Sequence, residues 1–212
     1  MLKLNEIFYS IQGEGTRAGL PCVFVRLTYC NLRCTYCDTE YSFYEGTDWE
    51  ISQVIDKVRD YNCNLVEITG GEPLIQAEVH PLMTQLCDLG YTVMIETGGS
   101  LDISPIDPRV TIIMDLKTPS SKMAKKNRYE NIPLLKSTDE VKFVIGSRED
   151  YEWSKEQLEI YNLPNRCNVL FSPVFGKIEP IEIAQWILHD NLSVRFQLQL
   201  HKFIWEPDTK GV

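Results

Sequence analysis

Three cysteines stand close together in the run 29–39, where Cys30, Cys34 and Cys37 have the spacing C-x3-C-x2-C. A cubane iron–sulfur cluster has four iron corners, and protein clusters usually have four cysteine ligands. Three thiolates therefore leave one iron without a protein ligand, and that iron is free to bind another molecule. The spacing indicates a [4Fe-4S] cluster with one open iron, held by the loop 30–37.

A structural zinc site is the alternative use of clustered cysteines. Such a site prefers four ligands, commonly supplied by paired C-x2-C motifs. No second pair and no nearby histidine completes a set of four here, although a non-catalytic zinc-binding module stays open as a distant alternative. The other four cysteines stand singly among apolar residues and are expected to be small buried hydrophobes: Cys22, Cys63, Cys87 and Cys167.

Composition narrows the class of protein. With 212 residues and 43% hydrophobic content, the chain fits one domain spanning residues 1–212. A net charge of −9 argues against a broad nucleic-acid surface, which would need a basic stripe. There is no apolar run long enough to span a membrane and no secretory signal, so we expect a cytoplasmic protein with reduced thiols.

Apolar segments of two kinds alternate along the chain. Strand-like runs rich in β-branched and aromatic residues are predicted at 22–28, 64–69, 91–96, 110–115, 140–145, 168–172 and 193–200. Helical spacing predicts helices at 51–61, 79–89, 149–161 and 179–189. The polar segment 119–133 has no clear period and is predicted to be a surface loop. Alternation of strands and helices predicts an α/β fold with a mostly parallel sheet, closed or partly closed into a barrel.

Polar or glycine-rich residues follow six of these strands. In a β/α barrel the carboxyl ends of the parallel strands form the active-site face, so all six segments should lie at one rim. They are the cysteine loop 30–37, then 69–73 (TGGEP), 96–99 (ETGG), 115–117 (DLK), 172–175 (SPVF) and 199–202 (QLHK).

The cysteine spacing, with Tyr36 before the third cysteine, resembles the signature of the radical S-adenosylmethionine (SAM) enzymes. The segment 70–73 (GGEP) resembles their GGE motif, although alone it could be a turn before a helix. The resemblance implies that the open iron binds the amino and carboxylate groups of SAM. It also implies that Tyr36 lies beside the adenine and that Glu72 meets the methionyl amino group.

The segment 6–15 (EIFYSIQGEG), followed by Gly19, Phe24-Val25-Arg26 and Cys37-Asp38-Thr39, closely resembles the 7-carboxy-7-deazaguanine synthase family. The likeness extends to the segment 199–202. It implies a single-domain, incomplete β/α barrel of the radical SAM type, usually a homodimer. The implied reaction is a ring contraction of 6-carboxy-5,6,7,8-tetrahydropterin to 7-carboxy-7-deazaguanine with loss of ammonia, on the route to queuosine. A radical made from SAM would take a hydrogen atom from C6 of the pterin, and SAM would be regenerated.

The same resemblance assigns site residues. The pterin would be bound by Ile11, Gln12, Gly13, Arg26, Thr69 and Pro207, and Mg²⁺ by Thr39. SAM would be bound by Tyr36, Cys37, Asp38, Gly71, Glu72, Asp115, Leu116, Lys117, Ser172, Pro173, Val174 and Phe175.

Elementary chemistry agrees with two of these assignments. Arg26 offers a planar, two-pronged donor set that matches the carboxylate of the substrate. Thr39 offers a neutral oxygen, which suits a Mg²⁺ ion held otherwise by substrate and water. Among the histidines, His201 beside Lys202 at the rim is a functional candidate or a structural polar pair, whereas His80 and His189 fit structural roles.

A glycyl-radical-enzyme activase is the nearer alternative, because it is also small and has the same cysteine spacing. That group usually has a DGPG-like stretch before the cysteines, where this chain has Gln12-Gly13-Glu14-Gly15. Either radical SAM function needs a one-electron donor, such as a flavodoxin or a ferredoxin. The sequence leaves the identity of the donor and the degree of barrel closure open.

Overall fold

The computed structural model describes residues 1–212 and contains one nine-stranded sheet in the order β3-β1-β2-β4-β5-β6-β7-β8-β9. Neighbouring strands from β2 to β9 are parallel, whereas β1 pairs antiparallel with β2 and β3. The strands are β1 (Leu2–Ile11), β2 (Pro21–Leu27), β3 (Thr47–Trp49), β4 (Leu65–Gly70), β5 (Thr92–Thr97), β6 (Thr111–Asp115), β7 (Glu140–Ile145), β8 (Asn168–Pro173) and β9 (Arg195–Phe196).

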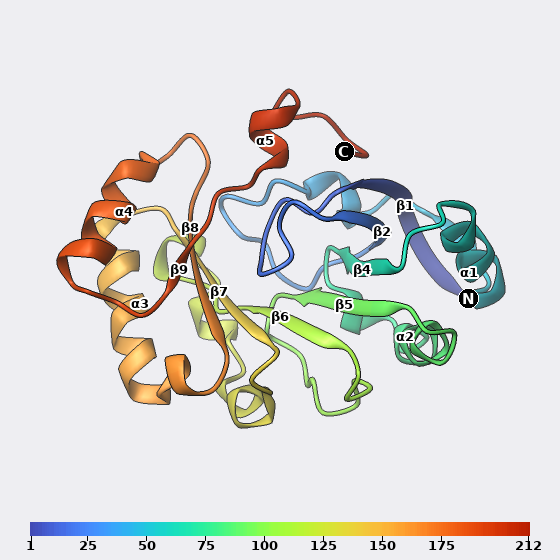
Figure 1. Ribbon diagram of the computed structural model, residues 1–212, viewed down its shortest axis with the longest axis horizontal. Coiled ribbons are helices and arrows are strands. Elements are labelled where there is room, and N and C mark those ends of the chain that lie inside the picture. Colours follow the sequence, from blue (N-terminus) through green and yellow to red (C-terminus); the bar gives the residue numbers. More distant parts are fainter.

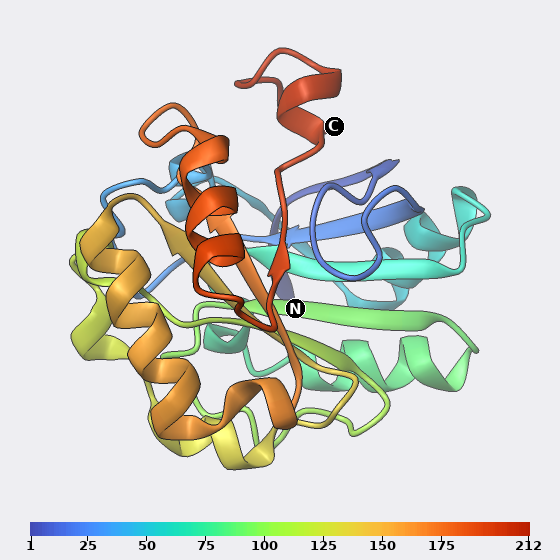
Figure 2. The same ribbon diagram turned by 60° about the vertical axis from the view of Figure 1, so that its left-hand side comes forward.

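Helices cover the outside of this curved sheet (Figures 1 and 2). They are α1 (Ile51–Asp60), α2 (Val79–Asp88), α3 (Arg148–Tyr161), α4 (Pro180–His189) and the short α5 (His201–Ile204). α1 and α2 lie at the β1–β5 end of the sheet, and α3 and α4 lie at the β7–β9 end. Because β3 and β9 are both free edges, the sheet is an open, partial β/α barrel.

The hydrophobic core lies mainly between the sheet and its helices. α1 buries Val54, Ile55 and Val58 and α2 buries Leu82 and Leu86, as the helical spacing predicts. A core cluster of 35 buried residues joins these helix faces to the strands. A second, smaller apolar cluster of six buried residues comes from β1, β2, β4, β5 and β6: Phe8, Cys22, Phe24, Leu65, Met94 and Ile113.

Six predicted strands and all four predicted helices are confirmed, with each end shifted by at most one residue. The predicted strand 193–200 is wrong in extent, because only Arg195–Phe196 pairs with β8 and the chain turns into α5 at His201. β1 and β3 are not among the predicted strands, because β1 mixes polar and apolar residues and β3 is only three mostly exposed residues long.

The segment 119–133 is not the simple surface loop that its polarity predicts. It contains three 3-10 helices, at Pro119–Ser121, Ala124–Lys126 and Tyr129–Leu134. Asn131 is fully buried and its amide donates to the carbonyl of Leu101 at 2.7 Å. Polar side chains that form hydrogen bonds with the backbone therefore anchor this segment. Such contacts leave no periodic pattern of apolar residues, so the sequence pattern does not predict them.

The carboxyl ends of the parallel strands meet at one edge of the sheet, where the cysteine loop follows β2. α5 and the C-terminus lie together at the top of Figures 1 and 2, beyond the strands. None of the helices combines the length and the apolar composition that crossing a membrane requires.

Candidate active site

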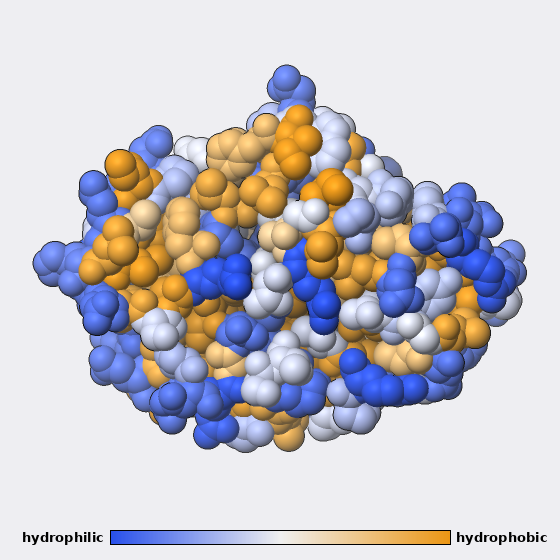
Figure 3. Space-filling view, viewed as in Figure 1, coloured by the Kyte–Doolittle hydropathy of each residue, from blue (hydrophilic) through white to orange (hydrophobic).

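A cavity of about 710 Å³ opens at the carboxyl edge of the parallel strands. Its wall includes all three cysteines of the loop, polar residues from β2 and β4–β8, the segment 12–15 that follows β1, and the C-terminal residues 207–212. In Figure 3, strongly hydrophilic residues lie at the centre of this view, with apolar areas beside them. The volume lies within the range of small-molecule and cofactor sites.

The cysteine loop fits an iron–sulfur cluster. Cys30, Cys34 and Cys37 are free, half-buried thiols, and the backbone N–H of Leu32 donates to Cys30 Sγ at 3.4 Å. Burial raises the pKa of the Cys30 and Cys34 thiols, while the nearby Lys117 acts in the opposite direction. A bound cluster supplies the positive charge that holds such thiols as thiolates.

No three or more His, Cys, Asp or Glu side chains form a group that could hold a single metal ion. A structural zinc site needs such a group, so the zinc alternative has no support from this geometry. The cysteines instead share one cavity wall with polar residues from six strands, which is an arrangement for ligands larger than an ion.

Gly71 explains how the cysteine loop can lie against the end of β4. A Cβ atom at this position would lie 2.2 Å from the carbonyl oxygen of Tyr29, the residue before Cys30. The backbone of Gly71 also donates to the carbonyl of Leu27 at 3.2 Å. Only glycine allows the GGE segment to approach the loop this closely.

Most residues predicted to bind SAM lie in the cavity wall. The Tyr36 hydroxyl lies 3.1 Å from Thr118 Oγ1, which fixes the ring beside the cysteines. The wall contains Tyr36, Cys37, Asp38, Gly71, Asp115, Lys117, Ser172, Val174 and Phe175, but not Glu72, Leu116 or Pro173.

Glu72 is fully buried behind the wall. Its carboxylate accepts hydrogen bonds from the backbone of Leu74 and Gly98, at 3.1 and 2.8 Å, and from the Thr97 hydroxyl at 2.9 Å. These bonds tie the start of the loop after β4 to the end of β5. In this structure the Glu72 carboxylate therefore shapes the wall, and its contact with SAM stays a prediction.

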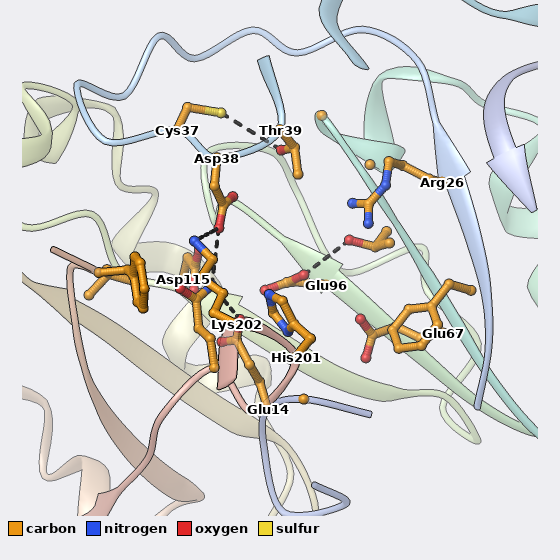
Figure 4. Close-up of a pocket in the computed structure, with 18 of the residues that line it drawn as sticks. Glu14, Arg26, Cys37, Asp38, Thr39, Glu67, Glu96, Asp115, His201 and Lys202 are labelled. Carbon is orange, nitrogen blue, oxygen red and sulfur yellow. Dashed lines mark hydrogen bonds and ion pairs between the residues drawn. The ribbon is translucent and has the colours of Figure 1, made fainter. Parts of the chain in front are cut away.

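The residues predicted to bind the pterin are all brought together. Ile11, Gln12, Gly13, Arg26, Thr69 and Pro207 line the same cavity. The Arg26 guanidinium points into it from β2 (Figure 4). Its Nε donates to Glu6 at 2.8 Å, and both terminal nitrogens are left without a carboxylate partner.

His201 packs against Gly13, so that a Cβ atom there would lie 2.4 Å from His201 Nδ1. Burial lowers the pKa of His201. His201 and Lys202 therefore belong to the cavity wall, as the rim position predicted. His80 and His189 do not line it, and His189 lies at the end of α4 beside Asp190.

Sequence reasoning missed a charged cluster deeper in the cavity. Lys142 on β7 is only 5% exposed and forms ion pairs with Glu14 at 3.0 Å, with Asp115 at 3.5 Å and with Glu96. Glu67 on β4 lies nearby, and burial together with the Glu96 carboxylate raises its pKa. The available signal was a charged residue inside each of three apolar strand segments, since charges are rarely buried in such strands without a role.

Comparisons with known proteins agree with this geometry. A family model described as the Radical SAM superfamily matches residues 25–163. A curated 7-carboxy-7-deazaguanine synthase of Chlorobaculum tepidum is 45% identical over all of this chain and 97% of that protein. Another, of Koribacter versatilis, is 43% identical over the whole of both chains.

Solved structures support the fold. The crystal structure of QueE from Escherichia coli has a TM-score of 0.77 at 21% identity and covers 93% of each chain. Streptococcus suis SuiB bound to S-adenosylmethionine has a TM-score of 0.57 over 81% of this chain and 45% of that chain. The cysteine loop, the open barrel and the full-length likeness agree: the chain belongs to the radical SAM superfamily and, within it, to the 7-carboxy-7-deazaguanine synthase family.

Proposed function

We propose that this protein catalyses the ring contraction of 6-carboxy-5,6,7,8-tetrahydropterin to 7-carboxy-7-deazaguanine, with loss of ammonia, in queuosine and deazapurine biosynthesis. One observation carries the proposal: three free cysteines and a separate set of polar residues line one cavity, in a chain that resembles named synthases over its full length. Residues 1–212 would form a single radical SAM domain.

Cys30, Cys34 and Cys37 would hold a [4Fe-4S] cluster, and residues next to them would bind SAM. When bound, the cluster and SAM supply one-electron chemistry that can remove a hydrogen atom from the substrate. The protein's own part is to place the ligands and exclude water. Tyr36, fixed by Thr118, would orient the adenine, and Asp38 would meet SAM at the mouth of the cavity.

Arg26 would bind the substrate carboxylate through its two terminal nitrogens. Its Nε is already held by Glu6, and the rings of Phe8 and Tyr41 lie 5.6 and 5.8 Å from the guanidinium carbon. The guanidinium is therefore fixed in direction before the substrate arrives, which lowers the entropy cost of binding. Thr39, 3.7 Å from Cys37 Sγ, would contribute its hydroxyl to a Mg²⁺ ion between SAM and the pterin.

A flavodoxin or a ferredoxin would supply the electron. Three exposed lysines without an ion pair, Lys122, Lys125 and Lys126, lie on the segment that holds the cysteine loop, because Thr35 bonds to the carbonyls of Ser120 and Ser121. In a chain of net charge −9 this positive area would attract an acidic donor. Replacing the three lysines with glutamine should slow reduction by flavodoxin at low salt and leave reduction by dithionite unchanged.

The deciding experiment is anaerobic turnover of the reconstituted protein with the carboxylated pterin, SAM, Mg²⁺ and dithionite, followed by mass analysis. We expect 7-carboxy-7-deazaguanine, with SAM not consumed in proportion to product. A glycyl-radical-enzyme activase would leave the pterin unchanged, and that result would overturn the proposal. Sedimentation velocity on the same sample would test the homodimer that the family resemblance implies.

A further inference from the structure

Glu67 differs from every other Asp or Glu side chain that lines the cavity. Within the wall, Glu14, Glu96 and Asp115 are paired with Lys142, and Asp38 is paired with Lys202. Glu40 and Asp208 are exposed at the mouth. Glu67 is 4% exposed, yet no basic group lies within ion-pair distance of it.

The hydrogen bonds of Glu67 are also incomplete. Oε2 accepts from Gln12 Nε2, and Oε1 accepts from no group in the protein. An ionised carboxylate can accept about four hydrogen bonds, and buried polar groups normally have their partners. Glu67 therefore presents free acceptor positions to the cavity.

Gln12 is arranged to hold this carboxylate. Its Oε1 accepts from the backbone of Glu14 at 3.2 Å, which fixes the amide so that Nε2 faces Glu67. The backbone of Gln12 is also occupied, because it bonds to Leu20 and Gly19 at 2.8 Å each. The side chain of Gln12 thus acts on a ligand mainly through Glu67.

The strand register places Glu67 at the floor of the cavity. Glu67 lies opposite Phe24 on β2 and Met94 on β5, both members of the small apolar cluster inside the barrel. Arg26 lies opposite Thr69, two residues nearer the carboxyl ends of the strands, a rise of roughly 7 Å. In Figure 4, Cys37 and Thr39 lie on one side of the cavity and Glu67 on the opposite side, with Arg26 between them.

A ligand that fills this depth needs an anionic group at the level of Arg26 and hydrogen-bond donors at its deep end. The proposed substrate has this polarity, since its carboxylate is on C6 and the opposite ring carries an amino group on C2 beside N3–H. Two neighbouring N–H donors match the two acceptor oxygens of one carboxylate, as a guanidinium does. The other buried carboxylates in the wall already have a lysine.

We propose that Glu67 is the specificity residue for the aminopyrimidinone ring, its carboxylate accepting hydrogen bonds from the 2-amino group and N3–H while Gln12 holds it in position. This assignment rests on the proposed function and deepens it. It orients the bicyclic substrate with C6 toward the cysteine loop and the aminopyrimidinone ring toward the apolar floor. Burial raises the pKa of Glu67 in the ligand-free protein. The two ring donors would stabilise the ionised carboxylate, so the carboxyl group would lose its proton when the ligand binds.

The test compares fluorescent pterin-6-carboxylate with its 2-deamino analogue, measured as dissociation constants under anaerobic conditions. The proteins are the wild type, Glu67→Gln and Glu40→Gln, the last being the same change at an exposed acid of the mouth. We expect the wild type and Glu40→Gln to prefer the aminated ligand by about tenfold or more, as for hydrogen bonds to a charged group. Glu67→Gln should lose that preference, because the side-chain amide of the variant places an N–H donor against the N–H donors of the ligand. Affinity for SAM and iron content should stay unchanged.

Equal preference in the wild type and Glu67→Gln would overturn the assignment. If Glu67→Gln does not fold, Glu67→Asp takes its place, because it keeps the charge on a side chain that is one methylene shorter. An unchanged preference of Glu67→Asp for the aminated ligand would also overturn the assignment. Failure of the proposed function gives a different pattern: the aminated ligand binds through Glu67, but anaerobic turnover yields no 7-carboxy-7-deazaguanine.

Discussion

The carboxylate of Asp38 and the ammonium group of Lys202 lie 3.0 Å apart, which joins the cysteine loop to α5 although 164 residues separate them in the chain. Gln199 Nε2 donates to the same carboxylate at 3.0 Å. Burial alone would raise the pKa of Asp38, but Lys202 and Gln199 lower it to about 2. The pair therefore stays ionised at neutral pH and ties α5 to the cysteine loop, and the chain continues from α5 into the segment 207–212 of the cavity wall.

Replacing Lys202 should loosen this closure. We expect Lys202→Gln to weaken pterin binding up to about fivefold, because an ion pair with a half-exposed partner contributes at most roughly 1 kcal/mol. Titration with the pterin measures the change. Lys57→Gln removes a surface pair with Asp60 at 3.8 Å and serves as the control. An equal change in both variants would show that Lys202 does not act on the site.

The cluster assignment predicts loss of function at three positions. Cys30→Ala, Cys34→Ala and Cys37→Ala should each abolish turnover and deplete iron, since each thiolate would hold one iron. Cys63→Ala should do neither, because Cys63 lies outside the cavity and contacts the carbonyl of Pro21. Iron analysis and the visible absorption of the anaerobic proteins provide the measurement. Full activity in Cys34→Ala would contradict the assignment.

Arg26→Lys should weaken pterin binding by roughly 1 to 3 kcal/mol, because an ammonium group cannot replace a two-pronged guanidinium. SAM affinity should change little, which calorimetry with each ligand can check. Arg26 also pairs with Glu6, so thermal unfolding of the variant is measured in parallel. If both ligands lost affinity to the same extent, Arg26 would be supporting the fold and not the substrate.

Thr39→Ala should lower turnover more than SAM binding, and should reduce the stimulation by added Mg²⁺. A capping role for the hydroxyl would cost about 1 kcal/mol of stability, but Thr39 forms no side-chain cap on the 3-10 helix Glu40–Phe43 that follows it. The melting temperature should therefore change little. Turnover is measured against Mg²⁺ concentration for both proteins. Superimposable normalised curves would mean that the ion is held elsewhere.

Glu67→Gln should stabilise the ligand-free protein at high pH. Burial and the Glu96 carboxylate raise the pKa of Glu67 from 4.5 to about 8. The folded state therefore holds this proton more tightly than the unfolded state, so the wild type loses stability as pH rises from about 4.5 to about 8. Denaturant unfolding should show the advantage of Glu67→Gln growing across this range. An advantage that does not vary with pH would mean that Glu67 is not the titrating group.

The sequence by itself determined the cofactor loop and most of the fold. The cysteine spacing depends on local chain geometry, and the parallel strands are continuous apolar segments because both of their faces are buried. Apolar residues at intervals of three and four predict the buried faces of α1 and α2. β1 mixes polar and apolar residues around a glycine-rich motif, so its sequence does not predict a strand. The 3-10 helices of the segment 119–133 are not predicted either, because polar side chains anchor that segment.

Only the tertiary structure decided which residues face each other across the cavity. Lys142, Glu14, Glu96 and Asp115 are distant in the chain and meet because strand register brings them to one face of a curved sheet. The same register sets Glu67 two residues below the level of Arg26, and the ion pair between Lys202 and Asp38 joins α5 to the cysteine loop. The local sequence shows that a charged residue lies within a strand. Whether that residue has an ion-pair partner, and which one, depends on how the strands pack in the folded chain.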